Sequence, residues 1–344
     1  MKRIFCLGMT MLSLGCITFG APNPKKGLVI GFAGFFTGNS WNNQTFATIE
    51  KAAAQDPEIA SLIVANADAN VEKQIAQIND MIDKRVDGIV CVAAAESAVN
   101  PVLESAVKAG IPVVVSNHYV TSKKLTSQVY VDQIKWGEVT GQWLVDKLGP
   151  KGGKIVCLNG VAGNSDNNGR WSGAKHVFDK HPEIKILATA NADWDQAKAQ
   201  PVVASWLAAY PEIDGVWSQG GAMTAAAMLE FQKAGRPLVP MVGEAYNGFM
   251  KLWSKNQANG FSSISPVEPN YLVQIGLEVV KRAAKGEKVP ALINPPLVII
   301  NDETLKDNVV WDMPDDYWPI NWLPQDKVDE IIKGAMNQGQ QGKT

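Results

Sequence analysis

The sequence predicts an α/β protein made of two doubly wound parallel-sheet lobes. Short apolar runs alternate with helix-length segments along most of the chain, and the same pattern occurs twice. Alternation of this kind is typical of parallel sheets with helices on both faces. The chain has 344 residues, more than the roughly 250–300 at which a single hydrophobic core stops growing. Two cores are therefore expected.

The individual elements follow from apolar runs and their spacing. Runs of four or five residues rich in Ile, Val and Leu predict strands at 28–32, 62–65, 88–92, 113–116, 154–158, 186–190, 215–218 and 239–243. Longer segments between them predict helices at 71–84, 99–109, 135–147, 222–234 and 271–284.

An internal repeat relates the two halves. Gly38-Asn-Ser-Trp-Asn-Asn43 resembles Gly163-Asn-Ser-Asp-Asn-Asn168, and the two segments are 125 residues apart. Three further matches have the same spacing: 57–59 with 182–184, 66–68 with 191–193, and 108–110 with 233–235. Four matches in one register predict two copies of one strand–helix unit.

The repeated segments each follow the first strand of a copy and precede a helix. Ligands of open parallel sheets bind beyond the carboxyl ends of the strands, so both segments are expected to line one cleft. Asn and Ser are also common helix N-caps, which is the alternative interpretation.

Polar and aromatic side chains follow other strands as well. Indole rings can cover the apolar faces of a sugar, and amide, carboxylate and guanidinium groups can bond its hydroxyls. The candidate ligand-binding residues are Asn39, Trp41, Asn42, Asn117, His118, Asp166, Asn168, Arg170, Trp194, Glu244 and Asn247.

Alternatives remain open for some of these residues. His118, at a strand end, can instead bond the backbone, and Arg170 can form a structural ion pair near a helix start. Trp206 and Trp217 lie in helix and strand patterns and are expected in the core. Three more tryptophans lie in a Pro-rich tail that is expected to clasp a lobe surface or to border a partner site: Trp311, Trp318 and Trp322.

The N-terminus predicts an export signal over residues 1–20. Lys2 and Arg3 precede a largely apolar stretch that is too short to span a bilayer and ends in small residues. Ser13-Leu-Gly-Cys16 is a weaker match to a lipoprotein signal. We expect cleavage to a soluble periplasmic form rather than lipid anchoring through Cys16.

Composition excludes several classes of function. The formal net charge of −2 offers no basic field for nucleic acid. No motif of a hydrolase, metalloprotease or phosphate-binding loop is present, so no catalysis, metal or cofactor is expected. Outside the predicted signal, Cys91 and Cys157 lie in strand patterns and are expected to be buried free thiols.

From Gly27 to about Ile300 the chain resembles the ribose-binding-like periplasmic proteins of ABC sugar importers. The resemblance rests on Ile111-Pro-Val-Val-Val-Ser-Asn-His118, Gly160-Val-Ala-Gly-Asn-Ser165, Ala192-Asp-Trp-Asp195, Val242-Gly-Glu244 and Gln274-Ile-Gly276. It implies a type I periplasmic-binding-protein fold with a three-strand hinge. Carried over by position, Asn39, Trp41 and Asn42 match the first-strand contacts, and Trp194 matches an aromatic stacker.

The chain departs from that family at other positions. Asn117 and His118 stand where ribose binders have Asp-Arg, and Asn168 stands where they have a contacting Arg. Glu244 neighbours the usual Asp position, here Ala245, and the late Gln contact is not evident near Glu268. These departures argue against ribose itself and favour another sugar, a sugar alcohol or a furanose.

Together these features predict a monomeric solute-binding protein that captures a monosaccharide or sugar alcohol by hinge closure. It would deliver the ligand to an ABC permease, with a chemoreceptor as a further partner. The expected lobes are 27–130 plus 262–292 and 131–261 plus 293–325, followed by a C-terminal helix and tail over 326–344. The expected crossovers lie near 129–133, 259–266 and 291–296. Alternatives are a receptor for a furanosyl signalling molecule or chemotaxis ligand, and a sugar-processing α/β enzyme.

Overall fold

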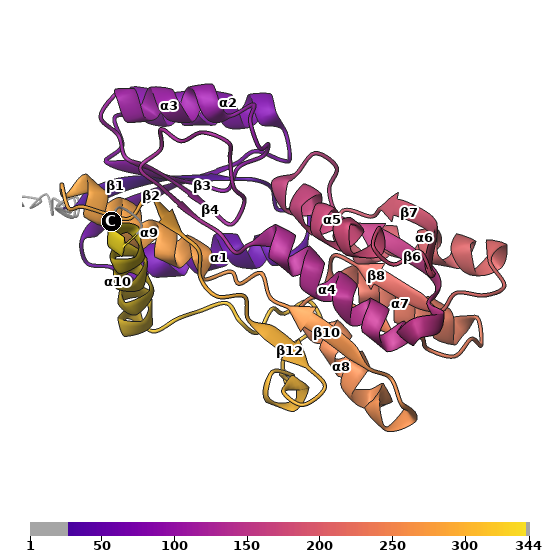
Figure 1. The fold of residues 1–344 in the computed structure, drawn as a ribbon. Helices are drawn as coiled ribbons and strands as arrows, with labels where there is room; N and C mark the ends of the chain where they lie inside the picture. The colour runs from indigo at the N-terminus through magenta and orange to yellow at the C-terminus, as the bar shows by residue number, and fades with distance from the viewer. Residues whose placement is uncertain (1–26, 342–344) are drawn as a thin grey trace, which may run out of the picture.

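The computed structural model describes residues 27–341, which form two α/β lobes, each built on a six-stranded sheet (Figure 1). The strand order is β11-β5-β4-β3-β1-β2 in the first sheet and β12-β10-β9-β8-β6-β7 in the second. Strand pairs are parallel throughout, except that β12 runs antiparallel to β10. The predicted fold class is confirmed.

The first part of the chain forms most of the first lobe. Its elements are β1 (Leu28–Gly34), α1 (Ser40–Gln55), β2 (Ile59–Asn66), α2 (Val71–Asp83), β3 (Gly88–Cys91), α3 (Asn100–Lys108), β4 (Val113–Ser116) and β5 (Ser127–Val129). The second lobe follows with α4 (Gln133–Leu148), β6 (Gly153–Asn159), α5 (Ser165–Phe178), β7 (Ile184–Asn191), α6 (Gln196–Ala209), β8 (Gly215–Ser218), α7 (Gly221–Lys233), β9 (Met241–Val242), α8 (Asn247–Asn256) and β10 (Ser263–Pro266). The last elements are α9 (Leu272–Ala284), β11 (Leu292–Ile293), β12 (Ile299–Asn301) and α10 (Gln325–Gln341).

The internal repeat is visible in the structure. The elements β1, α1, β2 and α2 begin 125 residues before β6, α5, β7 and α6, respectively. Even the backbone strain repeats, because Asp68 and Ala69 have φ of 50° and 58°, and Asp193 and Trp194 have φ of 54° and 55°. Left-handed backbone is unusual for residues other than glycine. The two copies therefore share one turn geometry, and only the second carries an indole on it.

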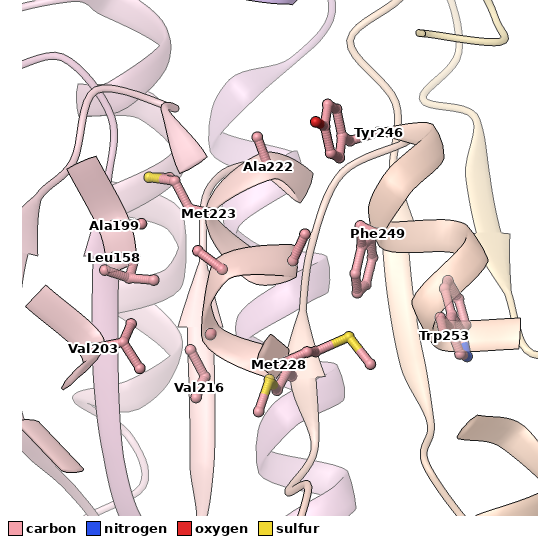
Figure 2. Close-up of a cluster of buried hydrophobic side chains, with 14 of the residues drawn as sticks. Leu158, Ala199, Val203, Val216, Ala222, Met223, Met228, Tyr246, Phe249 and Trp253 are labelled. Carbon is pink, nitrogen blue, oxygen red and sulfur yellow. The ribbon is translucent and has the colours of Figure 1, made fainter. Parts of the chain in front are cut away.

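Each lobe has an apolar core on both faces of its sheet. In the second lobe, one cluster joins Leu158 and Val216 of the sheet to α6, α7 and α8. Figure 2 shows side chains of α7 lying between those of α6, such as Val203, and those of α8, such as Phe249. A strand that is buried on both faces consists of a nearly continuous run of apolar residues. This is why the strands could be predicted from the sequence.

The chain crosses between the lobes at three places before its C-terminal segment. It leaves the first sheet after β5 for α4, returns after β10 to α9, which packs on β3 and β4, and leaves again between β11 and β12. Beyond β12, residues 302–324 lead back to α10, which packs against α9 and β11 (Figure 1). We call residues 302–324 the strap.

The structure agrees with the predicted elements and corrects one boundary. All eight predicted strands and all five predicted helices are present. However, β10 pairs with β9 and β12 and so belongs to the second sheet, whereas the sequence assigns residues from 262 onward to the first lobe. Ser263-Ile-Ser-Pro266 has too little apolar character to reveal which sheet it joins. The predicted signal over residues 1–20, with Cys16, and residues 342–344 of the predicted tail lie outside the described residues.

Two smaller points complete the fold. Cys91 and Cys157 are buried free thiols, as predicted, and burial raises the pKa of Cys91 to about 12. Between residues 27 and 341, none of the helices has the length and apolar character needed to cross a bilayer.

Candidate functional site

One cavity lies between the two lobes, beyond the carboxyl ends of their strands. Its accessible volume is about 30 Å³, which is room for about one or two water molecules, so the lining side chains nearly fill it. Its walls come from the segments after β1, β4, β7, β9 and β10, from the start of α5, and from the strap. The lining residues are Asn39, Trp41, Asn42, His118, Asp166, Trp194, Glu244, Glu268 and Trp318.

The start of α1 supplies one wall of this cavity. Asn39 is the N-cap of α1, and its side-chain oxygen accepts hydrogen bonds from the backbone N–H and side-chain amide of Asn42, at 2.9 and 3.0 Å. Trp41 donates its indole N–H to the backbone oxygen of Glu268 at 2.9 Å. The capping and cavity-lining interpretations of Asn39 therefore both hold.

His118 and Asp166 approach each other from opposite lobes. The imidazole Nδ1 lies 2.8 Å from the backbone oxygen of Ala93, and because a carbonyl only accepts, Nδ1 carries the proton. Nε2 then lies 3.6 Å from Oδ2 of Asp166. Both side chains are almost fully buried.

Arg170 lies buried behind the cavity rather than in its lining. Its guanidinium donates to Oε2 of Glu244 at 2.9 Å, to the backbone oxygen of Gln219 at 2.7 Å and, more weakly, to Oε2 of Glu268 at 3.5 Å. It also donates to the Gln133 side chain at 2.8 Å. The structural ion pair considered from the sequence is present, and it holds two carboxylates of the cavity wall in place.

Burial raises the pKa values of the carboxyl groups in this wall. Desolvation raises the pKa of Asp166 and of Glu244, although Arg170 opposes the shift in both, and His118 also opposes it in Asp166. The pKa of Glu268 is raised well above its usual range, first by burial and then by the nearby Asp166 charge. The ionised forms of these groups are therefore costly until donors from a ligand reach them.

Trp194 lies on the left-handed turn after β7, and two glycines make room for its ring. A Cβ on Gly160 would lie 2.0 Å from Cε2 of Trp194, and a Cβ on Gly220 would lie 2.8 Å from its Cδ1. Its indole N–H is buried without a hydrogen-bond partner among the described residues. The indole is therefore held from both sides and leaves a donor available to a ligand.

Besides Arg170, three predicted site residues lie outside the cavity lining. Asn117 is fully buried with φ of 66°, and Asn168 is exposed on α5. Asn247 donates to the backbone oxygens of Val310, Met313 and Pro314 and accepts from the backbone N–H of Val310. Both polar atoms of its side chain hold the strap.

Glu268 and Trp318 line the cavity but are absent from the sequence-based candidates. Glu268 follows β10, so the rule that linked polar residues to strand ends would have identified it had β10 been predicted. Trp318 comes from the strap, which has no strand or repeat to place it. Its sequence signal was only an aromatic residue in a Pro-rich tail.

The strap bonds to both lobes. On the second lobe it contacts α8 through Asn247 and through Lys251, which donates to the backbone oxygen of Met313 at 2.6 Å. On the first lobe, Gln44 of α1 exchanges two hydrogen bonds with the backbone of Trp318, at 2.7 and 3.0 Å. The indole N–H of Trp318 donates to the Ser40 hydroxyl at 3.0 Å. The strap thus adds a fourth connection between the lobes.

The chain belongs to the periplasmic binding protein domain family, whose model matches residues 30–288. Members of this family are solute receptors and not enzymes. The strap lies beyond the matched residues.

Relatives of known function extend the comparison. The chain is 28% identical to a xylitol-binding protein of Mycolicibacterium smegmatis, over 88% of this chain and 85% of the relative. It is 26% identical to the ribose import binding protein of Bacillus subtilis, over 79% of this chain and 87% of the relative. An ABC transporter solute-binding protein of Thermobispora bispora shares the fold, with a TM-score of 0.81 and 23% identity over 91% of this chain and 96% of its own.

Proposed function

We propose that this protein captures a sugar or sugar alcohol between its lobes and delivers it to an ABC import permease. The supporting observation is a cavity to which the first lobe contributes an indole, two amides and an imidazole, and the second lobe an indole and carboxyl groups. A polyhydroxylated ligand has apolar C–H faces that indoles can cover and hydroxyl groups that can donate to carboxylates. The names of the xylitol- and ribose-binding relatives support the same class of ligand.

Ligand capture would work by closure of the lobes. Asn39, Trp41, Asn42 and His118 belong to the first lobe. The cavity-lining residues at the start of α5 and after β7 and β9 belong to the second. A ligand bonded by both sets gains its full contacts only in the closed form, so it shifts the equilibrium toward closure.

The partners and the compartment follow from this role. The protein would be exported by the segment 1–20, act in the periplasm as a monomer, and present its closed form to the permease. A chemoreceptor that reads the same closed form is a second partner in this proposal.

A thermal-shift screen against pentoses, hexoses and alditols tests the proposal, because a ligand that binds only the folded protein raises its melting temperature. We expect a concentration-dependent shift with at least one of these compounds. Stabilisation by amino acids or peptides only, with no response to any sugar or alditol, would reject it.

Two variants connect the response to this cavity. Trp194→Ala should remove the ligand-induced shift while the protein alone still unfolds cooperatively. Trp311→Ala is the matched control, because this indole is 55% exposed and does not line the cavity. Loss of the response in the control but not in Trp194→Ala would place binding elsewhere.

A further inference from the structure

The cavity wall holds more carboxyl groups than cationic side chains. Asp166, Glu244 and Glu268 are 3%, 4% and 3% exposed, respectively. The one permanently charged cation bonded to them is Arg170, which reaches Glu244 at 2.9 Å and Glu268 at 3.5 Å. Asp166 accepts a hydrogen bond from the Ser165 hydroxyl at 3.3 Å and lies 3.6 Å from the imidazole of His118. Three carboxyl groups therefore share one guanidinium and one imidazole.

Two carboxyl oxygens of this wall are left without a donor within hydrogen-bond distance. Oε1 of Glu268 is buried and has no partner among the described residues. The basic atom nearest to Oδ2 of Asp166 is Nε2 of His118, which lies 3.6 Å away, beyond hydrogen-bond distance. Because ionised carboxylates only accept hydrogen bonds, these oxygens call for donors supplied by a ligand.

The indole rings that line the cavity can also bind a cation. Trp41, Trp194 and Trp318 contribute three indoles to one cavity. Trp41 and Trp318 use their N–H groups on protein oxygens, so what they offer a ligand is ring surface. Indole faces carry negative charge density and attract a desolvated cation.

A bound metal ion does not account for this charge. Among residues 27–341, no group of three His, Cys, Asp or Glu side chains is placed to hold a metal. A neutral ligand would donate hydroxyl hydrogens but would leave the carboxyl groups without a compensating positive charge whenever they ionise. A protonated amine supplies both donors and the missing positive charge.

We infer that the ligand is a polyhydroxylated amine, such as an amino sugar or an amino alditol, whose ammonium group contacts Glu268 and Asp166. This inference rests on the proposed function, and it narrows the ligand from polyols in general to cationic ones. The hydroxyl groups of such a ligand would bond the asparagine side chains at the start of α1, and its C–H faces would contact the indoles.

Calorimetry on matched pairs tests it. Each neutral compound that binds in the thermal-shift screen is compared with its amino-deoxy counterpart, together with D-glucose against D-glucosamine and D-glucitol against 1-amino-1-deoxy-D-glucitol. We expect the amine of the binding pair to bind about tenfold tighter or more, since hydrogen bonds to charged groups exceed neutral ones by that order.

The outcomes separate the two proposals. Equal or tighter binding of the neutral member overturns the cationic ligand and leaves sugar capture standing. Binding of neither class overturns both.

A variant locates the charge contact. Glu268→Gln keeps the shape and removes one charge, so the amine should lose about tenfold in affinity while any neutral polyol changes far less. Glu212→Gln is the control, because Glu212 is an exposed partner of Lys154 outside the cavity. If amine and neutral ligands lose the same affinity in Glu268→Gln, then Glu268 does not distinguish charged from neutral ligands. That result would overturn the inference.

Discussion

Nε2 of His118 lies 3.6 Å from Oδ2 of Asp166, and the two side chains come from opposite lobes. They are 3% exposed each, so the lobes meet here through a buried pair and not only through the polypeptide crossings. Because Nδ1 of the imidazole donates to the backbone oxygen of Ala93, its position in the first lobe is fixed. Movement of Asp166 away from it therefore measures the opening of the cavity.

A methyl group at Gly160 should disturb the site through Trp194. The added Cβ would lie 2.0 Å from the ring, so Gly160→Ala must displace the indole, and ligand affinity should fall about tenfold or more. Gly334→Ala in α10 is the control, because nothing lies within 4 Å of its added Cβ. Isothermal titration of both variants with the same ligand checks this, and unchanged affinity in Gly160→Ala would show that the ring does not contact ligand.

Removal of the Arg170 charge should destabilise the fold. Arg170→Leu leaves Glu244 and Glu268 without their cation, and breaking a buried pair of this kind costs about 3–5 kcal/mol. Arg282→Leu, which breaks partly exposed pairs with Glu278 and Asp329, should cost clearly less than Arg170→Leu. Urea denaturation measures both. Similar losses in the two variants would mean that the Arg170 contacts contribute no more than surface ones.

Stability should depend on pH through Glu268. Its pKa is raised in the folded state, so the folded protein holds this proton more tightly than the unfolded chain, whose Glu pKa is about 4.3. The resulting stabilisation is complete below that value and is lost as pH rises through the folded-state pKa. Compared with the wild type, Glu268→Gln should therefore become relatively more stable at pH 8 than at pH 5.

Glu212→Gln is the control for this comparison, because the pKa of Glu212 is lowered whereas that of Glu268 is raised. Lys154 lowers the pKa of the exposed Glu212 carboxyl, so its small contribution is present above about pH 4.3 and is lost as pH falls. Glu212→Gln should show no gain relative to wild type between pH 5 and pH 8. Urea denaturation at constant ionic strength gives both differences. Parallel pH profiles for wild type and Glu268→Gln would contradict the assignment.

The strap should contribute to binding through Trp318. Trp318→Ala removes one indole from the cavity wall, and ligand affinity should fall about tenfold. Trp318→Phe keeps an aromatic ring but loses the hydrogen bond to Ser40, so it should retain more of the affinity. Titration of both variants separates ring contact from strap anchoring. Equal, full affinity in both would place Trp318 outside the ligand's reach.

Much of the site could be predicted because the parallel sheet orders its strand ends. Asn39, Trp41 and Trp194 follow buried apolar strands, and the carboxyl ends of such strands converge at one edge. The repeat at 125 residues then implied a matching edge in the second lobe. Seven of the eleven candidates line the cavity, namely Asn39, Trp41, Asn42, His118, Asp166, Trp194 and Glu244.

The remaining positions depended on contacts between segments distant in sequence. Glu268 follows a strand too polar to recognise, and Asn247 is occupied by a strap that begins more than fifty residues later. A position at a strand end indicates that a side chain can reach the cleft. It does not indicate whether another chain segment already occupies the hydrogen-bonding groups of that side chain. Arg170 shows the same limit, since its buried partners come from three separate segments.

The sequence by itself therefore determined the two α/β lobes, their duplication and the edge at which they face each other. These properties are encoded locally, in apolar runs and in turns that repeat at a fixed spacing. Only the tertiary structure decided that Trp318 closes the cavity, that Arg170 lies behind it, and that three carboxyl groups gather around one guanidinium. Those arrangements arise from the packing of chain segments against one another, which no local pattern specifies.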